Sequence, residues 1–144
     1  MTDPKQNAAS LIIYTDGGSR NNPGPAALGY VIFDHQGRQI EARGQFLGET
    51  TNNVAEYRAM IAAAERAVQI HAPDVTFRVD SQLLQRQITR RYRVRSPHLK
   101  PLFDRLTDIL KHLPKWRIEH IPREQNRTAD HMVNLAIDAR GDIA

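Results

Sequence analysis

The spacing of apolar residues changes along the chain, and this change restricts the possible folds more than any other feature. Three short strand-like segments come first, at 11–16, 27–33 and 39–47, and turn-forming residues separate them. From Asn53 apolar residues recur at helical spacing until Pro73, and a strand-like alternation returns at Val75–Val79. The pattern therefore predicts consecutive strands followed by strands that are linked through helices.

The second half of the chain continues this alternation. A short helix is expected at 83–88, a longer one at 99–112, a last strand at 116–121 and a closing helix at 128–139. An antiparallel hairpin followed by helix-linked strands implies an α/β fold, with a five-stranded mixed sheet whose first three strands are antiparallel and whose faces are covered by helices.

Composition sets the class of protein. A chain of 144 residues is expected to form a single domain, here at 10–140, after a polar tail at 1–9. The absence of cysteine excludes zinc–thiolate sites, disulfides and thiol nucleophiles. Without an apolar run near the ~20 residues of a membrane span, or an apolar leader, we expect a cytoplasmic protein with no membrane contact. The formal net charge of +4 is compatible with a polyanionic partner.

Acidic residues occur at positions where each has an ordinary structural explanation. Asp16 is compatible with a turn, Asp80 with a helix N-cap, and Asp130 with the first turn of the closing helix. Glu56 follows Asn53 by three residues, which resembles a capping box. Asp16 and Asp80 are nevertheless more informative together, because both follow predicted strands and ligand sites of α/β folds form at such ends.

The segments around these acids carry a family resemblance. Tyr14–Pro25, Thr51–Ala59, Val79–Leu84 and Pro122–Asp130 occur in this order, and together they resemble type 1 ribonuclease H over about residues 11–139. The stretch 92–103 is similar to the subgroup that lacks an extra basic helix. The resemblance implies the ribonuclease H fold and an endonuclease that hydrolyses the RNA strand of RNA–DNA hybrids, leaving 5′-phosphate and 3′-hydroxyl ends.

The resemblance also implies the site. Asp16, Glu56, Asp80 and Asp130 would be the catalytic residues and would bind two Mg²⁺ ions, with Mn²⁺ as a substitute. Two hard cations can activate a water molecule and stabilise the departing oxygen of a phosphodiester, and oxygen ligands suit Mg²⁺. Clustered carboxylates without metal repel one another, so we expect some of them to have raised pKa values.

Polar residues near these motifs are candidates for contact with the hybrid. By resemblance they would read the 2′-hydroxyl of the RNA rather than the bases. Several also have ordinary alternatives as turn or cap residues, and for Asn53 both roles are compatible. The expected substrate-binding residues are Gly17, Gly18, Asn22, Thr51, Asn52, Asn53 and Gln82.

Two further segments are interpreted as possible phosphate or loop contacts. The basic stretch 90–95 is either a solvated face or a phosphate clamp through Arg91 and Arg93, in place of the missing basic helix. Many family members carry a mobile catalytic histidine before the last aspartate. His120 is instead expected within the last strand, so Arg123 or Glu124 would occupy that region.

Other functions remain open at this stage. One alternative is a non-catalytic module that binds hybrids, although the presence of all four acids argues against it. Another is a related nuclease, such as an integrase or exonuclease of the same metal-binding fold. The sequence does not decide whether double-stranded RNA is also cut. A monomer is expected.

Overall fold

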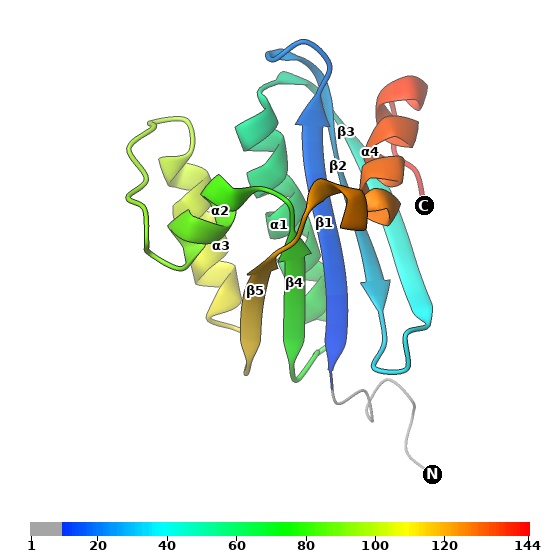
Figure 1. The fold of residues 1–144 in the computed structure, drawn as a ribbon, viewed down its shortest axis with the longest axis vertical. Coiled ribbons are helices and arrows are strands. Elements are labelled where there is room, and N and C mark those ends of the chain that lie inside the picture. Colours follow the sequence, from blue (N-terminus) through cyan, green and yellow to red (C-terminus); the bar gives the residue numbers. More distant parts are fainter. Residues whose placement is uncertain (1–9) are drawn as a thin grey trace.

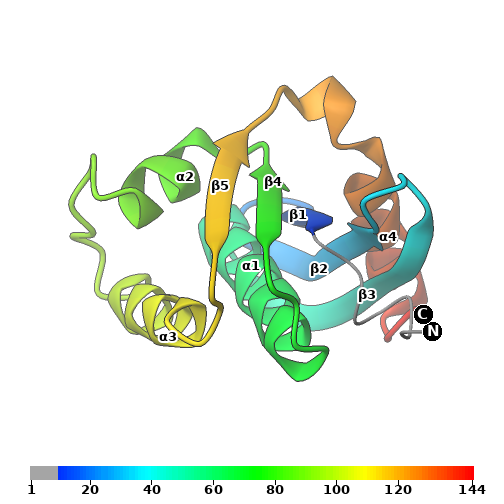
Figure 2. The same ribbon diagram turned by 90° about the horizontal axis from the view of Figure 1, so that it is seen from below.

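The computed structural model describes residues 10–144, so the predicted tail at 1–9 lies outside the described residues. Five strands form one sheet with helices against both of its faces (Figures 1 and 2). A single 3-10 turn, Arg123–Gln125, lies before the last helix in the described part. The elements are β1 (Leu11–Ser19), β2 (Gly24–Phe33), β3 (Gln39–Thr50), α1 (Asn52–Gln69), β4 (Val75–Val79), α2 (Gln82–Ile88), α3 (Lys100–Leu110), β5 (Trp116–His120) and α4 (Arg127–Ala139).

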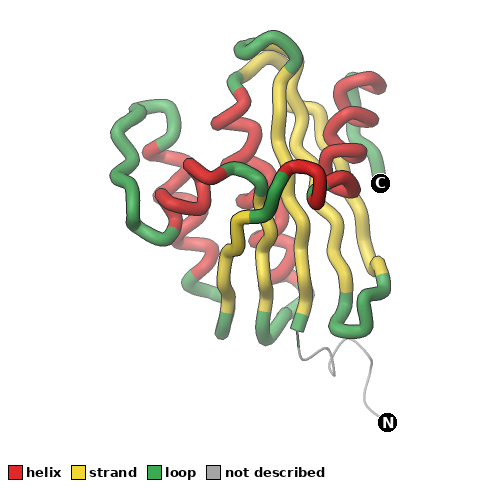
Figure 3. Tube along the Cα trace, viewed as in Figure 1, coloured by secondary structure: helices red, strands yellow, loops and turns green. Residues whose placement is uncertain are grey.

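The strands are arranged in the order β3-β2-β1-β4-β5. β1, β2 and β3 pair in antiparallel fashion, whereas β4 is parallel to β1 and β5 is parallel to β4. The strands in Figure 3 lie side by side between helices. The predicted α/β class, the mixed five-stranded sheet and its three initial antiparallel strands are therefore confirmed.

Some element boundaries differ from those predicted. β1 continues through Gly17 and Gly18 to Ser19, because it remains paired with β2 as far as the Ser19–Ala26 pair. Asp16 therefore lies inside a strand and does not begin a turn. β2 begins three residues earlier and β3 ends three residues later than expected. α1 ends at Gln69, before the predicted stop at Pro73, and the remaining boundaries shift by at most two residues.

Two helix caps also differ from the predictions. Thr51 caps α1, because its Oγ1 accepts a hydrogen bond from the amide of Val54 at 3.2 Å. Asn53 is therefore a residue of the helix and not its cap. Ser81 caps α2 by accepting from the amide of Leu84 at 3.1 Å, so the capping role proposed for Asp80 is wrong. Glu56 is therefore not explained by a capping box with Asn53, and Asp80 is not explained as a helix cap.

The sheet separates two apolar layers. On one face α1 packs against β1 and β2, and Ile13, Tyr30 and Phe77 are almost fully buried there. α3 lies on the same side of the sheet and packs against α1. On the other face α4 packs against β2 and β3 through a smaller cluster that includes Ala27 and Val133. Figure 2 shows α1 and α3 on one side of the sheet and α4 on the other. Within residues 10–144, none of the helices combines the length and apolar character needed to cross a membrane.

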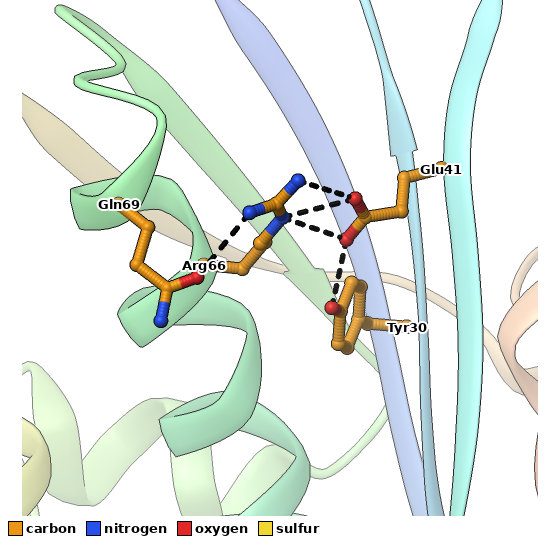
Figure 4. Close-up of polar contacts among 4 residues, drawn as sticks. All are labelled: Tyr30, Glu41, Arg66 and Gln69. Atoms are coloured by element: carbon orange, nitrogen blue, oxygen red, sulfur yellow. Dashed lines mark hydrogen bonds and ion pairs between the residues drawn. The ribbon is translucent and has the colours of Figure 1, made fainter. Parts of the chain in front are cut away.

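A polar cluster joins α1 to β2 and β3 (Figure 4). The Arg66 guanidinium donates to both carboxylate oxygens of Glu41, with Nε–O distances of 2.9 and 3.0 Å, and it also donates to Gln69. The hydroxyl of Tyr30, which is buried, donates to the same carboxylate at 2.8 Å. Burial, followed by this contact with Glu41, raises the pKa of Tyr30 to about 12. The cluster therefore depends on the single carboxylate of Glu41.

Replacing Glu41 by alanine is expected to lower the free energy of unfolding by about 1–3 kcal/mol. The substitution leaves the buried Tyr30 hydroxyl without its acceptor, and a buried donor without a partner costs about that much. Urea unfolding measures the change. Glu49→Ala, an exposed glutamate on the same strand, is the control and should change stability by less than ~0.5 kcal/mol. An equal effect of the two substitutions would contradict the prediction.

Candidate active site

Strand pairing brings two of the predicted acids next to each other. β1 and β4 are parallel neighbours, and Thr15 pairs with Val79, so Asp16 and Asp80 follow at the same level of the sheet. Thr15 and Val79 are buried on the α1 face, since Val79 belongs to the core cluster with α1 and Gly17, two residues after Thr15, lies against Ala55. Because side chains alternate along a strand, Asp16 points to the opposite face. Asp80 directly follows β4, and its carboxylate accepts a hydrogen bond from Asn126 just before α4. Both acids are only partly buried.

Glu56 reaches this point because α1 begins directly against β1. A Cβ on Gly17 would lie 2.2 Å from the carbonyl carbon and oxygen of Ala55 and 2.5 Å from the amide nitrogen of Glu56. Only a residue without a side chain permits this approach. Glu56 then shares a small depression with the two aspartates, and this depression is lined by Thr15, Asp16, Glu56, Val79, Asp80, Ser81 and Leu84.

Asp130 arrives from the other face by a similar device. Gly29 pairs with Asp16 across β1 and β2, and a Cβ on Gly29 would lie 2.6 Å from the carbonyl oxygen of Ala129. The first turn of α4 therefore rests on the sheet beside Asp16, and Asp130 is the next residue. Asn134, one turn later, donates to the Asp130 carboxylate at 3.3 Å. The four predicted acids thus gather at one edge of the sheet.

The proximity of these acids changes their ionisation. Burial is the largest contribution to the pKa of Asp16, and repulsion from Asp80, Asp130 and Glu56 adds to it, so that this pKa rises to about 9. Burial, with a further contribution from Asp80, raises the pKa of Glu56 to about 7 against the opposing hydrogen bond to Ser81. The expectation of raised pKa values is therefore met by two of the four acids.

The Asp16→Asn substitution is expected to stabilise the metal-free protein at pH 8 but not at pH 4. The folded state favours the protonated form of Asp16, so folding stability falls as the pH rises from the unfolded pKa of ~3.9 to the folded value of about 9. Asparagine cannot ionise and escapes this loss. We expect a gain of at least about 1 kcal/mol at pH 8, or roughly 3–5 °C in Tm.

Thermal unfolding in EDTA at both pH values measures this effect. Asp104→Asn, an exposed aspartate on α3, is the control and should give the same small change at both pH values. A Tm gain of Asp16→Asn that is equal at pH 4 and pH 8 would contradict the prediction, because it would not arise from ionisation of this carboxyl group.

Six of the seven residues predicted to bind substrate form a rim next to the acids. Asn52 accepts hydrogen bonds from the amide of Ser19 at 2.7 Å and from its hydroxyl at 3.2 Å. The Asn22 side chain accepts from the amide of Asn52 at 3.0 Å. Gly17, Gly18, Asn22, Thr51, Asn52 and Asn53 thus lie together where the β1–β2 turn meets the start of α1. Gln82 is exposed at the start of α2, one residue after Ser81 of the depression.

The other candidates occupy separate positions. Arg91 and Arg93 are exposed in the segment between α2 and α3 and are not among the residues that line the depression. Arg123 and Glu124 are exposed in the 3-10 turn that precedes α4.

His120 lies within β5, as predicted, where it is the last residue and pairs with Val79. Its side chain therefore leaves the sheet on the same face as Val79, and His120 does not line the depression that contains Asp80.

Two residues that the sequence analysis passed over take part in this site. Ser81 contacts Glu56, and Asn126 donates to the Asp80 carboxylate at 3.0 Å. Asn126 is fully buried. Its only sequence signal is its position just before the closing helix, which is typical of a cap and does not indicate burial.

The chain matches known proteins over most of its length. The family model described as reverse transcriptase-like matches residues 14–136. Ribonuclease HI of Halobacterium salinarum is 41% identical over 125 residues, which cover 87% of this chain and 63% of that protein. A bifunctional protein of Mycobacterium tuberculosis is 38% identical over 136 residues, which cover 93% of this chain and 37% of that protein. The chain thus spans less than two thirds of these two relatives.

Solved structures agree with these matches over nearly their whole length. The crystal structure of RNase H1 from Halobacterium salinarum has a TM-score of 0.87 and 39% identity, and covers 90% of this chain and 98% of that one. LC11-RNase H1, solved in complex with an RNA/DNA hybrid, has a TM-score of 0.85 and 44% identity with the same coverage, 90% and 98%. The fold, the order of the motifs and these identities agree, and the chain belongs to the ribonuclease H1 family.

Proposed function

We propose that this protein is an endonuclease that hydrolyses the RNA strand of RNA–DNA hybrids. The observation that carries the proposal is the gathering of Asp16, Glu56, Asp80 and Asp130 from two strands and two helices at one partly open edge of the sheet. Such a cluster is unfavourable for folding, because burial and then repulsion from the neighbouring acids raise the pKa of Asp16 to about 9. The related LC11-RNase H1 was solved with an RNA/DNA hybrid, which supports the choice of substrate.

The donor set fits divalent cations. Every candidate ligand is a carboxylate, and carboxylate oxygens suit Mg²⁺, with Mn²⁺ as a substitute. Within residues 10–144, no three Asp, Glu or His side chains are arranged to hold an ion by themselves. This agrees with Mg²⁺, which commonly takes one or two carboxylates and fills its remaining positions with water and phosphate oxygens. When bound, two such ions would supply an activated water molecule and charge stabilisation at the leaving oxygen, giving 5′-phosphate and 3′-hydroxyl ends.

The residues of the chain would divide the work between them. Asp16, Glu56, Asp80 and Asp130 would hold the ions and, through them, orient the scissile phosphate. The rim formed by Gly17, Gly18, Asn22, Thr51, Asn52 and Asn53, with Gln82, would contact the minor groove of the hybrid. The side-chain oxygens of Asn22 and Asn52 accept hydrogen bonds within the rim, which leaves the side-chain NH₂ groups of both residues as donors. Such donors can recognise the 2′-hydroxyl groups that distinguish RNA from DNA.

Charge reversal at Arg91 and Arg93 tests the basic segment as a phosphate clamp. The double substitution to glutamate should raise KM about tenfold with little change in kcat. Two lost phosphate contacts should also reduce the slope of log K against log salt by roughly 1–2. The matched control reverses Arg105 on α3 and Lys111 directly after α3, which changes the net charge equally. If both pairs change KM and the salt slope alike, the basic segment is a solvated surface. The same conclusion applies to Arg123 and Glu124 if their substitution leaves KM and the salt slope unchanged.

A substrate panel separates the candidate functions. Labelled RNA–DNA hybrid, duplex RNA and duplex DNA are incubated with the protein in Mg²⁺, Mn²⁺ or EDTA. We expect cleavage of the hybrid with either ion and none in EDTA. Binding of the hybrid without cleavage in any metal would instead indicate a non-catalytic binding module. Cleavage of duplex RNA as well would extend the substrate range, and cleavage of duplex DNA would overturn the assignment.

A further inference from the structure

One buried side chain lies where β1, β4 and α4 meet. Asn126 has 0% of its surface exposed, and its amide nitrogen has two acceptors. Nδ2 donates to the main-chain carbonyl of Thr15 at 2.8 Å and to Oδ2 of Asp80 at 3.0 Å. A single amide group therefore joins the residue before Asp16 to Asp80 itself.

The orientation of this amide is determined by its partners. The carbonyl of Thr15 and the carboxylate of Asp80 only accept hydrogen bonds, so both must face the nitrogen of Asn126 and not its oxygen. Oδ1 is consequently left buried without a hydrogen-bond partner. Leaving a buried acceptor unpaired is unfavourable, and buried polar groups without partners are uncommon. The arrangement keeps this disadvantage and retains both bonds to the site.

The main chain of Asn126 adds a third connection. Its carbonyl accepts the amide of Asp130 at 3.1 Å, which is the first hydrogen bond of α4. The residue whose side chain bonds both Thr15 and Asp80 is therefore also the one from which α4 starts. Asn126 therefore bonds directly to Asp80 and Asp130, and it bonds to Thr15, the residue before Asp16.

We propose that Asn126 is a positioning residue, which holds Asp80 and the start of α4 in register with Asp16 so that the carboxylates can bind metal together. This inference rests on the proposed function. Groups that orient metal ligands typically affect metal affinity or activity by about 10–100-fold when they are removed. A residue that only stabilised the fold would affect unfolding and leave metal affinity unchanged.

The test compares Asn126→Ala with Gln87→Ala. Gln87 is also a buried amide, 5% exposed, but it accepts from the Tyr57 hydroxyl and lies outside the site. We measure Mn²⁺ binding by calorimetry without nucleic acid, thermal unfolding, and kcat and KM on the hybrid. Asn126→Ala should weaken Mn²⁺ binding and lower kcat about 10–100-fold, with KM within about threefold of wild type. Gln87→Ala should lower Tm but keep Mn²⁺ affinity within about twofold.

Mn²⁺ affinity of Asn126→Ala equal to wild type, together with a Tm loss like that of Gln87→Ala, would overturn the proposal. Should Asn126→Ala fail to fold, Asn126→Ser serves instead, since a serine hydroxyl can donate only one hydrogen bond, and wild-type Mn²⁺ affinity of that variant is equally adverse. Failure of the proposed function itself would be seen in the wild type, as neither Mn²⁺ binding nor hybrid cleavage. In that case a crystal structure of Asn126→Ala tests the positioning role separately. A shift of the Asp80 carboxylate relative to the Thr15 carbonyl would support the role, and an unchanged position would contradict it.

Discussion

Replacing Asp80 by asparagine should reduce hydrolysis of the RNA strand at least about 1000-fold at saturating Mg²⁺. A metal ion that stabilises developing charge contributes several kcal/mol to catalysis, and each 1.36 kcal/mol corresponds to a factor of ten in rate. The substitution removes one negative ligand but preserves the shape of the side chain. Its Oδ1 can still accept the hydrogen bond that Asn126 donates to Asp80. The loss should therefore appear in the rate and not in folding.

Single-turnover cleavage of a labelled hybrid with excess protein measures this rate. His120→Ala is the informative control, because His120 ends β5 and does not line the depression formed by Asp16, Glu56 and Asp80. This variant should retain activity within about threefold. Thermal unfolding of both variants shows whether they remain folded. Retention of more than a tenth of the wild-type rate by Asp80→Asn would remove this carboxylate from the reaction. A loss in His120→Ala comparable to that of Asp80→Asn would restore a catalytic role for the histidine.

Replacing Gly17 by alanine should destabilise the protein by about 3 kcal/mol or more. The new Cβ would lie 2.2 Å from the Ala55 carbonyl, and these are backbone atoms that cannot rotate away. The start of α1 must therefore move off β1, which opens the packed layer between them. Overpacking of a well-packed interior costs ~1–3 kcal/mol, and a clash between backbone segments belongs at or above the upper end of that range. The same movement carries Glu56 away from Asp16, so activity should fall as well.

Gly18→Ala is a neighbouring control with the opposite expectation. The nearest atom to a Cβ on Gly18 is Asn52 Oδ1 at 3.8 Å, which is ordinary van der Waals contact. Its unfolding free energy should stay within about 0.5 kcal/mol of wild type in urea titrations. Equal stabilities of the two alanine variants would mean that α1 does not need the close approach at Gly17.

The order of the elements was predictable because burial of one face imposes a period on each of them. Val75, Phe77 and Val79 alternate with more polar residues, and this alternation predicted β4 correctly. The caps were less predictable. Thr51, Asn52 and Asn53 are all residues that cap helices well, so local preference does not choose among them. The choice falls on Thr51 in a structure where the Asn52 side chain is already bonded to Ser19, a contact 33 residues away in the chain.

The role of the glycine pair after Asp16 was misinterpreted for a similar reason. Two glycines after a strand are typical of a turn, which placed the end of β1 at Asp16. In the fold the strand continues through both residues, and Gly17 allows α1 to approach instead. Local sequence reports conformational preference, whereas close approach between distant segments depends on what lies opposite, which only the tertiary structure contains.

The candidate site divides in the same way. The chain alone predicted the fold class, because the hydrophobic period is a local property. It also predicted the four acidic residues, because the motifs around them resemble those of a known family and occur in the same order. The meeting of those acids depended on long-range packing: the register of β1 with β4, the two glycines that admit α1 and α4, and the burial of Asn126 between them. The clustered carboxylates repel one another, so no local preference brings them together. The energy that holds them comes from apolar layers elsewhere in the fold.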